Sequence, residues 1–288
     1  MALENEIEKN IENKITNFNF QLFSDIHSEL WGCVPDMKPI SKYLFLAGNI
    51  GQFKRQNFMP IIDYCSKNWK KTFYIAGNNE FWSPNYMCKS FEEYEFEYKY
   101  FIETKYKNVF FLNNNEAHIE NNLYVYGTTL WTRPTNISRK EMLGQGIMDY
   151  NNIYFRCHNK NYNVPITTKY MQDLSDLQYN KLIKYVNENS NNVSKKVIIM
   201  THFPPTQNNT IMPSEIHSSF MNNINAWDNL LDNLSLDNIP LWISGHTHYG
   251  YDFLSSNNKT RLLSNQMGYK SEFGKTGFSE LGLFKLKY

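Results

Sequence analysis

The chain has few cysteines and no close pair of them among its 288 residues. The four are Cys33, Cys65, Cys88 and Cys157. This wide spacing is neither a disulfide framework nor a zinc-ribbon motif, so the sequence predicts free thiols in a reducing compartment. The chain also lacks an apolar segment of signal-peptide length and any run long enough to span a bilayer. We therefore expect a soluble, cytoplasmic protein with no membrane partner.

The chain also has no large excess of basic or of acidic residues. The formal net charge is +1, from 29 Lys and Arg residues against 28 Asp and Glu residues. Without a broad positive field to attract a phosphate backbone, a nucleic-acid substrate is disfavoured. The composition leaves the oligomeric state undetermined.

No internal repeat or central linker divides the chain, and its hydrophobic content of 41% is enough for one large core. We predict a single domain over residues 18–288, preceded by an N-terminal extension over residues 1–17. Apolar residues recur at every fourth position of that extension, which fits either a short amphipathic helix or a frayed tail.

Short apolar runs rich in aromatic or β-branched residues predict buried strands. These runs cover residues 19–24, 43–47, 72–76, 197–200 and 241–244. Helical segments fit between several of them, at residues 58–69, 89–105 and 167–189. Hairpin pairs at 117–119 with 123–126 and at 251–254 with 261–263, and a last strand at 281–286, complete the expected elements. This alternation predicts an α/β protein with mixed sheets.

Side chains suited to metal binding follow the predicted strands. Asp25 and His27 lie two positions apart after the first strand, so in extended backbone their side chains would point to the same side. His246 and His248 repeat that spacing behind Gly245, whose small size allows the backbone to turn closely around an ion. Neutral imidazoles are common ligands of transition metals. We predict that these groups gather at one sheet edge and bind a cation.

Further candidates follow the other strands, but each has a common structural explanation. His202 follows the strand at 197–200, where a lone histidine is usually structural, and Asn78 behind Gly77 is a typical turn residue. Together the candidates are harder to explain in this way, because four of the seven histidines fall at predicted strand ends. The joint pattern therefore favours a metal site.

The order of these groups resembles that of the calcineurin-like metallophosphoesterases. The family pattern is Asp-any-His, Gly-Asp, Gly-Asn-His-Glu, a lone His and Gly-His-any-His, and this chain follows that order from Asp25 to His248. The segments at 126–131, 148–150 and 260–262 also resemble the small single-domain phosphohydrolases of the family, so the likeness spans nearly the whole chain. It implies a four-layer α/β/β/α sandwich of two mixed β-sheets flanked by helices.

The resemblance also implies two divalent metal ions, whose identity (Mn, Fe, Zn, Mg or Ni) stays open. The implied ligands are Asp25, His27 and His248 for the first metal, Asn78, His202 and His246 for the second, and position 49 as the bridge. Such a dinuclear centre activates water and stabilises charge on phosphoryl oxygens. The implied activity is hydrolysis of a phosphate mono- or diester in a small phosphorylated substrate.

Two positions depart from the family pattern. Asn49 stands in place of the bridging Asp, and a neutral amide supplies no charge between two cations, so we expect weaker metal binding, above all at the second site. Asn79 stands in place of the His in Gly-Asn-His-Glu, which supports the leaving oxygen. Because an amide donates no proton at neutral pH, this change is expected to cost roughly a hundred- to ten-thousand-fold in rate.

Three explanations account for these asparagines: drift in a chain where about one residue in seven is Asn, selection of a silent binding protein, or deliberate substitution in an active enzyme. Both changes fall where they stop chemistry most effectively and spare every other ligand, which favours the third explanation. The alternative function is a catalytically silent phosphoesterase-like protein that binds a phosphorylated ligand or partner.

Other candidates concern the substrate. Arg133 follows a predicted strand and could bind a substrate phosphate through its guanidinium group, although a solvated arginine is the commoner case. Asn265 and Tyr269 could line the same pocket. Phe81 and Trp82 lie beside the metal segments, where they either stack on a substrate ring or close the core.

Overall fold

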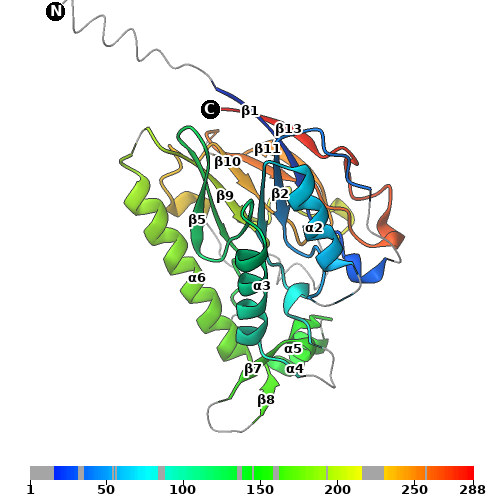
Figure 1. The fold of residues 1–288 in the computed structure, drawn as a ribbon. Coiled ribbons are helices and arrows are strands. Elements are labelled where there is room, and N and C mark those ends of the chain that lie inside the picture. The colour runs from blue at the N-terminus through cyan, green and yellow to red at the C-terminus, as the bar shows by residue number, and fades with distance from the viewer. Residues whose placement is uncertain are drawn as a thin grey trace, which may run out of the picture.

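Figure 1 shows the fold of the chain, a computed structural model that describes residues 16–31, 36–53, 55, 57–83, 88–134, 138–144, 146–157, 162–192, 194–215, 230–256 and 258–288. Residues 1–15 of the N-terminal extension predicted at 1–17 lie outside these residues, as do Cys33, His158 and His217, whereas Asn17 already begins the first strand. Cys65, Cys88 and Cys157 are free thiols.

Two mixed β-sheets face each other at the centre of the molecule. The first sheet has the order β13 (Leu283–Lys287), β1 (Asn17–Phe23), β2 (Tyr43–Ala47), β3 (Lys71–Ile75) and β4 (Val109–Phe111). Strands β1 to β4 run parallel, and β13 pairs with β1 in the antiparallel direction. The closing strand expected at the end of the chain is therefore confirmed.

The second sheet has the order β11 (Tyr251–Leu254), β12 (Arg261–Ser264), β10 (Leu241–Ile243), β9 (Lys196–Thr201), β6 (Leu123–Thr128) and β5 (Asn115–Glu120). Its four inner strands are parallel, and each edge strand pairs with its neighbour as an antiparallel hairpin. Both predicted hairpins are confirmed. A separate two-stranded sheet contains β7 (Tyr154–Arg156) and β8 (Asn163–Pro165).

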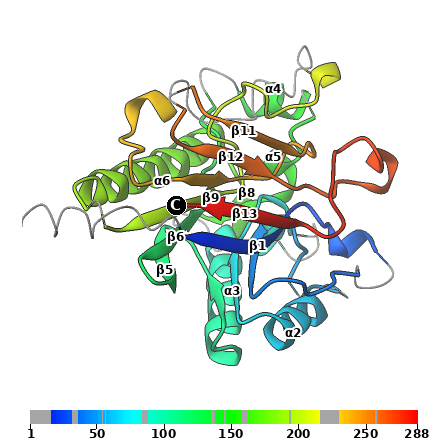
Figure 2. The same cartoon turned by 90° about the horizontal axis from the view of Figure 1, so that it is seen from above.

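Helices cover the outer faces of the two sheets. Helices α2 (Phe58–Asn68) and α3 (Phe91–Lys105) pack on the first sheet, and α6 (Thr168–Asn189) packs on the second (Figure 2). The predicted four-layer sandwich is confirmed. The shorter elements are α4 (Arg139–Gly144), α5 (Asp149–Asn152), η1 (Ser28–Leu30), η2 (Asn79–Phe81), η3 (Pro213–Glu215), η5 (Leu231–Asn233) and η6 (Lys270–Glu272).

Strand β2 shows why the sheets stack in this way. Every residue of β2 is buried, because alternate side chains enter two different cores. Leu44 and Leu46 pack with α2 and α3, whereas Tyr43, Phe45 and Ala47 face the second sheet. A strand buried on both faces needs a continuous apolar sequence, which is the pattern that predicted it.

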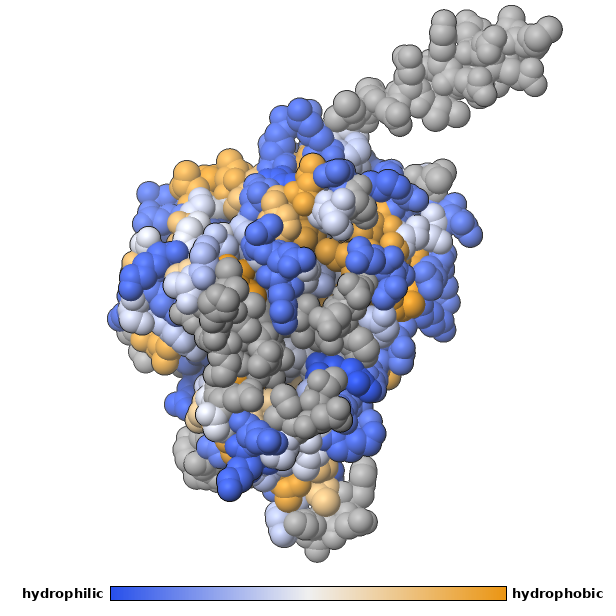
Figure 3. Space-filling view, turned by 180° about the vertical axis from the view of Figure 1, so that it is seen from behind, coloured by the Kyte–Doolittle hydropathy of each residue, from blue (hydrophilic) through white to orange (hydrophobic). Residues whose placement is uncertain are grey.

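The outer surface is varied. Figure 3 shows hydrophobic side chains in several separate areas of the face it draws, mixed with hydrophilic ones. Among the described helices, the structure contains none with the length and apolar character required to cross a membrane.

Close packing between the sheets gives a first prediction. A Cβ atom added at Gly127 in β6 would lie 2.5 Å from Leu112 Cβ and 2.7 Å from Ile75 Cγ2. Gly127→Ala should therefore lower the free energy of unfolding by about 1–3 kcal/mol, measured by urea denaturation. The control is Gly144→Ala, where the new Cβ meets no atom within 4 Å of the described structure. Equal stability of the two variants would contradict this packing.

Candidate metal centre

The predicted metal-binding residues converge at the carboxyl ends of parallel strands from both sheets. Asp25 and His27 follow β1, Asn49 follows β2, Asn78 and Asn79 follow β3, His202 follows β9, and His246 and His248 follow β10. The expectation of one sheet edge is wrong, because β1, β2 and β3 belong to the first sheet and β9 and β10 to the second. The two sheets meet face to face, so their strand ends bring these groups together.

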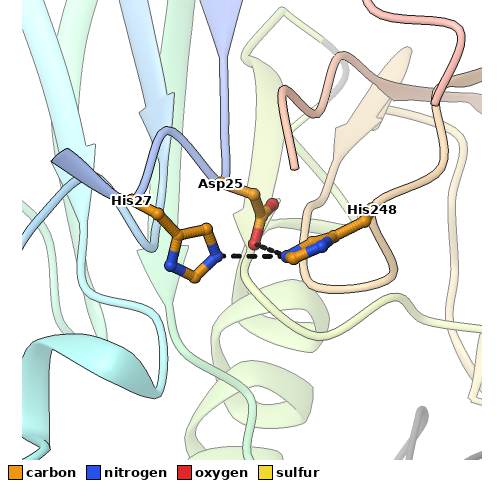
Figure 4. A group of neighbouring side chains, drawn as sticks. All are labelled: Asp25, His27 and His248. Carbon is orange, nitrogen blue, oxygen red and sulfur yellow. Dashed lines mark hydrogen bonds and ion pairs between the residues drawn. The ribbon is translucent and has the colours of Figure 1, made fainter. Parts of the chain in front are cut away.

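One half of the site contains Asp25, His27 and His248 (Figure 4). The Nε2 atoms of the two histidines lie 3.1 Å apart, and His248 Nε2 lies 3.6 Å from Asp25 Oδ1. One ligand atom from each residue falls within 4.8 Å of the other two. Asp25 and His27 are almost fully buried, and the His248 side chain is 12% exposed.

Two carboxylates orient these imidazoles from behind. Glu29 Oε1 lies 3.1 Å from His27 Nδ1, and Glu272 Oε2 lies 2.7 Å from His248 Nδ1. Because a carboxylate accepts hydrogen bonds, each imidazole in its neutral form would carry its proton on Nδ1 and turn an Nε2 lone pair toward the other imidazole. Two lone pairs 3.1 Å apart repel, and a cation between them would bind both. The donor set therefore fits a divalent metal.

The acidic groups around His248 attract positive charge to this position. Burial by itself lowers the pKa of His248, but the hydrogen bond to Glu272 and the charge of Asp25 raise it above the usual value. The pKa of Glu272 falls below its usual value, because contact with His248 outweighs the opposing effect of burial. Negative charge thus surrounds this half of the site.

The other half of the site contains His202, His246 and Asn78. His202 Nδ1 donates to the Ala47 carbonyl oxygen at 2.9 Å, which leaves its Nε2 lone pair 3.2 Å from Asn78 Oδ1, also an acceptor. Asn78 Nδ2 donates to Asp149 at 2.9 Å, so the amide oxygen faces inward. Burial lowers the pKa values of His202 and His246, which keeps both imidazoles in the neutral form that binds metals.

Asn49 lies between the two halves. Its Nδ2 atom donates to Asp25 Oδ1 at 3.1 Å and to Asn78 Oδ1 at 3.0 Å, and its Oδ1 atom accepts from the backbone of Asn79 at 2.9 Å. The amide therefore joins the halves by hydrogen bonds and turns an N–H₂ group, which is no metal ligand, toward both.

The backbone at the ligands differs from the extended form expected from the sequence. Asp25, His27, Asn49, His246 and His248 all have φ between 50° and 75°, in the left-handed region. The reason given for the convergence of Asp25 and His27 is therefore wrong, although their side chains do meet. Such conformations persist only where the surroundings hold them. Here the His246 N–H donates to Asp25 Oδ2 at 2.9 Å, and the His27 N–H donates to the Asn49 carbonyl oxygen at 2.9 Å.

Glu80 fixes the loops after β2 and β3. Its Oε2 atom accepts from the backbone N–H groups of Asn49 and Gly77 at 2.9 and 2.8 Å, and its Oε1 atom accepts from those of Ile50 and, at 3.4 Å, Gly51. Burial raises the pKa of Glu80 to about 7, although these N–H donors act in the opposite direction. The side chain is fully buried, so we assign it to the support of the ligand loops.

A cavity of about 550 Å³ opens over the ligands, and Asn49, Asn78, His246 and His248 lie in its wall. Tyr269 also lines it, with its ring centroid 4.6 Å from those of His27 and His248. Burial raises the pKa of Tyr269 to about 12.

Two of the substrate candidates lie elsewhere. Asn265 is buried and donates to the backbone oxygens of Leu22 and Ser279, so the expectation that it lines the pocket is wrong. Arg133 Nε donates to Asp176 of α6 at 2.6 Å, while its neighbour Thr132 lines the cavity. A phosphate contact by Arg133 stays a prediction.

Several residues that complete the site were missed from the sequence. They are Glu29, Glu80, Asp149 and Glu272. Glu29 lies only two residues after His27, so its position was a usable signal. Glu80 belonged to the motif already identified, but its role required the loop geometry. Asp149 and Glu272 are remote in sequence from the residues they hold, and no local pattern marks them.

A cluster of Asp, Asn and His side chains at the strand ends of a two-sheet sandwich is typical of a metallophosphoesterase type of protein. The chain belongs to the calcineurin-like phosphoesterase family, whose family model matches residues 18–250. It is 25% identical over 264 residues to the uncharacterised protein L509 of Acanthamoeba polyphaga mimivirus, covering 86% of this chain and 90% of that protein. The predicted family is confirmed.

A solved structure supports the fold. The crystal structure of phosphopantetheinyl hydrolase (PptH) from Mycobacterium tuberculosis matches with a TM-score of 0.62 and 13% sequence identity. The match covers 93% of this chain and 95% of that chain. At this identity the likeness concerns the fold alone.

The buried carboxylate at position 80 gives a second prediction. Glu80→Gln places an N–H₂ group against backbone N–H groups that now donate to a carboxylate. The free energy of unfolding of the metal-free protein should fall by about 3 kcal/mol, measured by urea denaturation with a chelator present. Glu188→Gln on α6, whose parent side chain is 62% exposed, is the control and should change stability little. A Glu80→Gln protein as stable as the control would show that the carboxylate does not hold the loops.

Proposed function

We propose that this protein is a metal-dependent phosphoesterase whose dinuclear metal centre hydrolyses a phosphate mono- or diester in a small phosphorylated molecule. The proposal rests on one observation above all. The Nε2 atoms of His27 and His248 lie 3.1 Å apart beside Asp25, and His202 Nε2 lies 3.2 Å from Asn78 Oδ1, so groups able to bind a metal face one another in both halves of the site. Membership of the calcineurin-like phosphoesterase family supports the same chemistry.

The chain's own residues would orient and hold the reacting groups. When bound, the metals would supply a water activated at neutral pH and stabilisation of charge on the phosphoryl oxygens. Glu29 and Glu272 keep the Nε2 atoms of His27 and His248 directed inward. Asn79 lies beside His27, with its Nδ2 atom 3.0 Å from His27 Nδ1, and occupies the position where the family pattern has the histidine that supports the leaving oxygen.

We further propose that Asn49 and Asn79 impair this activity. Asn49 offers hydrogen bonds where the family pattern has a charged bridge, so the second metal should bind more weakly than the first. Asn79 cannot protonate a leaving alkoxide, so esters of weakly acidic alcohols should react most slowly.

The alternative, a silent protein that binds a phosphorylated ligand or partner, is favoured by the N–H₂ group that Asn49 turns toward Asp25 and Asn78. The extent of the domain (residues 18–288), the cytoplasmic location and the origin of the two asparagines stay predictions.

Metal binding provides a third prediction. Because the folded protein gathers the ligands and the unfolded chain does not, Mn²⁺ at a hundred times its Kd should raise the free energy of unfolding by about 2.7 kcal/mol. His248→Ala should remove most of this gain. His118→Ala is the matched control, because His118 is exposed on β5 and lies outside the cluster. Urea denaturation with and without Mn²⁺ provides the measurement, and equal responses of the two variants would disprove the site.

Restoring the family residues provides a fourth prediction. Asn49→Asp together with Asn79→His should raise the Mn²⁺-dependent hydrolysis of 4-nitrophenyl phosphate or its bis-ester at least a hundredfold. Asn49→Asp alone should raise bound metal toward two equivalents per chain, measured by elemental analysis. The matched control is the surface pair Asn121→Asp with Asn180→His. A restored protein with two bound metals and no gain in rate would favour the silent binder.

A further inference from the structure

Three side chains stand between the metal-site cavity and a second cavity. Trp82, Asn79 and Tyr269 line both the first cavity, of about 550 Å³, and the second, of about 430 Å³. We call these three residues the ridge. Both volumes lie in the range of small-molecule sites, so each cavity can receive an organic group of its own.

The two cavities differ in chemistry. Away from the metal ligands, the first cavity has an apolar wall formed by Ile147, Met148, Phe203, Ile211 and Met212. The second cavity presents Gln52 and the guanidinium group of Arg55, for which the described residues supply no ion-pair partner. Its acidic residue, Glu29, is directed toward His27. Lys275 also lines the first cavity, so a basic residue is present in both, and the extended apolar wall is what distinguishes the first cavity from the more polar second one.

The ridge is tied to the metal ligands. Asp149 Oδ1 accepts from Trp82 Nε1 at 2.6 Å and from Asn78 Nδ2 at 2.9 Å, so one oxygen atom orients the indole and a ligand amide together. The backbone of Tyr269 donates to Glu272, the carboxylate that holds His248, at 2.7 Å. A phosphorus atom at the ligands would thus have a fixed position relative to both cavities.

We propose that the substrate is a phosphodiester whose two organic groups lie on opposite sides of the ridge. An apolar group packs on the wall that includes Met148, and the leaving group extends past Asn79 into the second cavity, where Arg55 binds an anionic end. A monoester has only one organic group and would fill one cavity. This inference rests on the proposed function, because the phosphoryl group must lie at the metal ligands.

The proposed reaction is the hydrolysis of one of the two ester bonds to phosphorus. The oxygen of water forms a bond to phosphorus while the bond from phosphorus to the leaving oxygen breaks. One proton of the water reaches the leaving alcohol through solvent, because Asn79 cannot supply it. The products are a phosphomonoester of the apolar alcohol and a free alcohol with an anionic end.

The slow turnover expected of this chain suits a binding experiment with probes that cannot be hydrolysed. We would measure the Kd of benzylphosphonate, a monoester mimic, and dibenzylphosphinate, a diester mimic, by calorimetry with saturating Mn²⁺. Burial of the second benzyl group should make dibenzylphosphinate bind about tenfold more tightly, although it carries one negative charge fewer. A carboxylate on one ring should improve binding further.

Single substitutions test which part of the probe each cavity binds. Arg55→Gln should remove the gain from the carboxylate and leave the affinity for unsubstituted dibenzylphosphinate unchanged. Met148→Ser, at a side chain that is 44% exposed, should weaken the binding of dibenzylphosphinate about threefold. The control for Arg55 is Arg156→Gln, at an exposed position on β7.

The outcomes separate this inference from the proposed function. Mn²⁺-dependent binding of benzylphosphonate with equal or weaker binding of dibenzylphosphinate would overturn the diester assignment and leave the phosphoesterase proposal standing. An unchanged carboxylate gain in Arg55→Gln would overturn the role of the second cavity. If neither probe responds to Mn²⁺, the phosphoesterase proposal fails, and the diester inference fails with it.

Discussion

Repulsion between acceptor groups is the constraint on which the centre of this molecule depends. Five acceptor atoms from two sheets meet in a buried region, and the hydrogen bonds behind His27, His248 and His202 leave their Nε2 lone pairs pointing inward. Bringing such groups together costs free energy unless a positive charge compensates. The N–H₂ group of Asn49 offsets part of this cost at Asp25 and Asn78, and a bound cation would offset more of it.

The surrounding loops are built to maintain that arrangement. Residues in left-handed conformations are normally costly, by about 1 kcal/mol or more each. Here the carboxylate of Glu80 collects backbone N–H groups from two loops, and the carboxylate of Asp25 accepts the N–H of His246 from the opposite sheet. Buried acidic groups thus serve as candidate metal ligands at the centre and as acceptors for the backbone around it.

Much of the fold could be predicted, because its information is local. The bounds of β2 match the apolar run at 43–47, and the start of α3 follows Ser90, whose side chain forms a capping box with Glu93. The grouping of the histidines could also be predicted, since parallel strands place their carboxyl ends on one side. The left-handed backbone at Asp25 could not, because it results from contacts with loops more than twenty residues away.

The residues that support the site divide in the same way, into those marked by nearby sequence and those brought in from remote segments. Position 29 lies close to His27 in sequence, whereas Glu272 belongs to η6, 24 residues after the His248 that it contacts. The pairing of Arg133 with Asp176 depends on where α6 passes, which no motif encodes. Contacts between segments that are remote in sequence therefore cannot be predicted from local residue patterns.

One oxygen atom of Asp149 accepts hydrogen bonds from both the indole of Trp82 and the amide of Asn78. The environment of Trp82 is consequently linked to the state of Asn78 through a single shared acceptor. Any rearrangement of the amide alters the electrostatic field at the indole, so the ultraviolet emission of this side chain is an intrinsic optical signal of events at the centre, available without a chemical label.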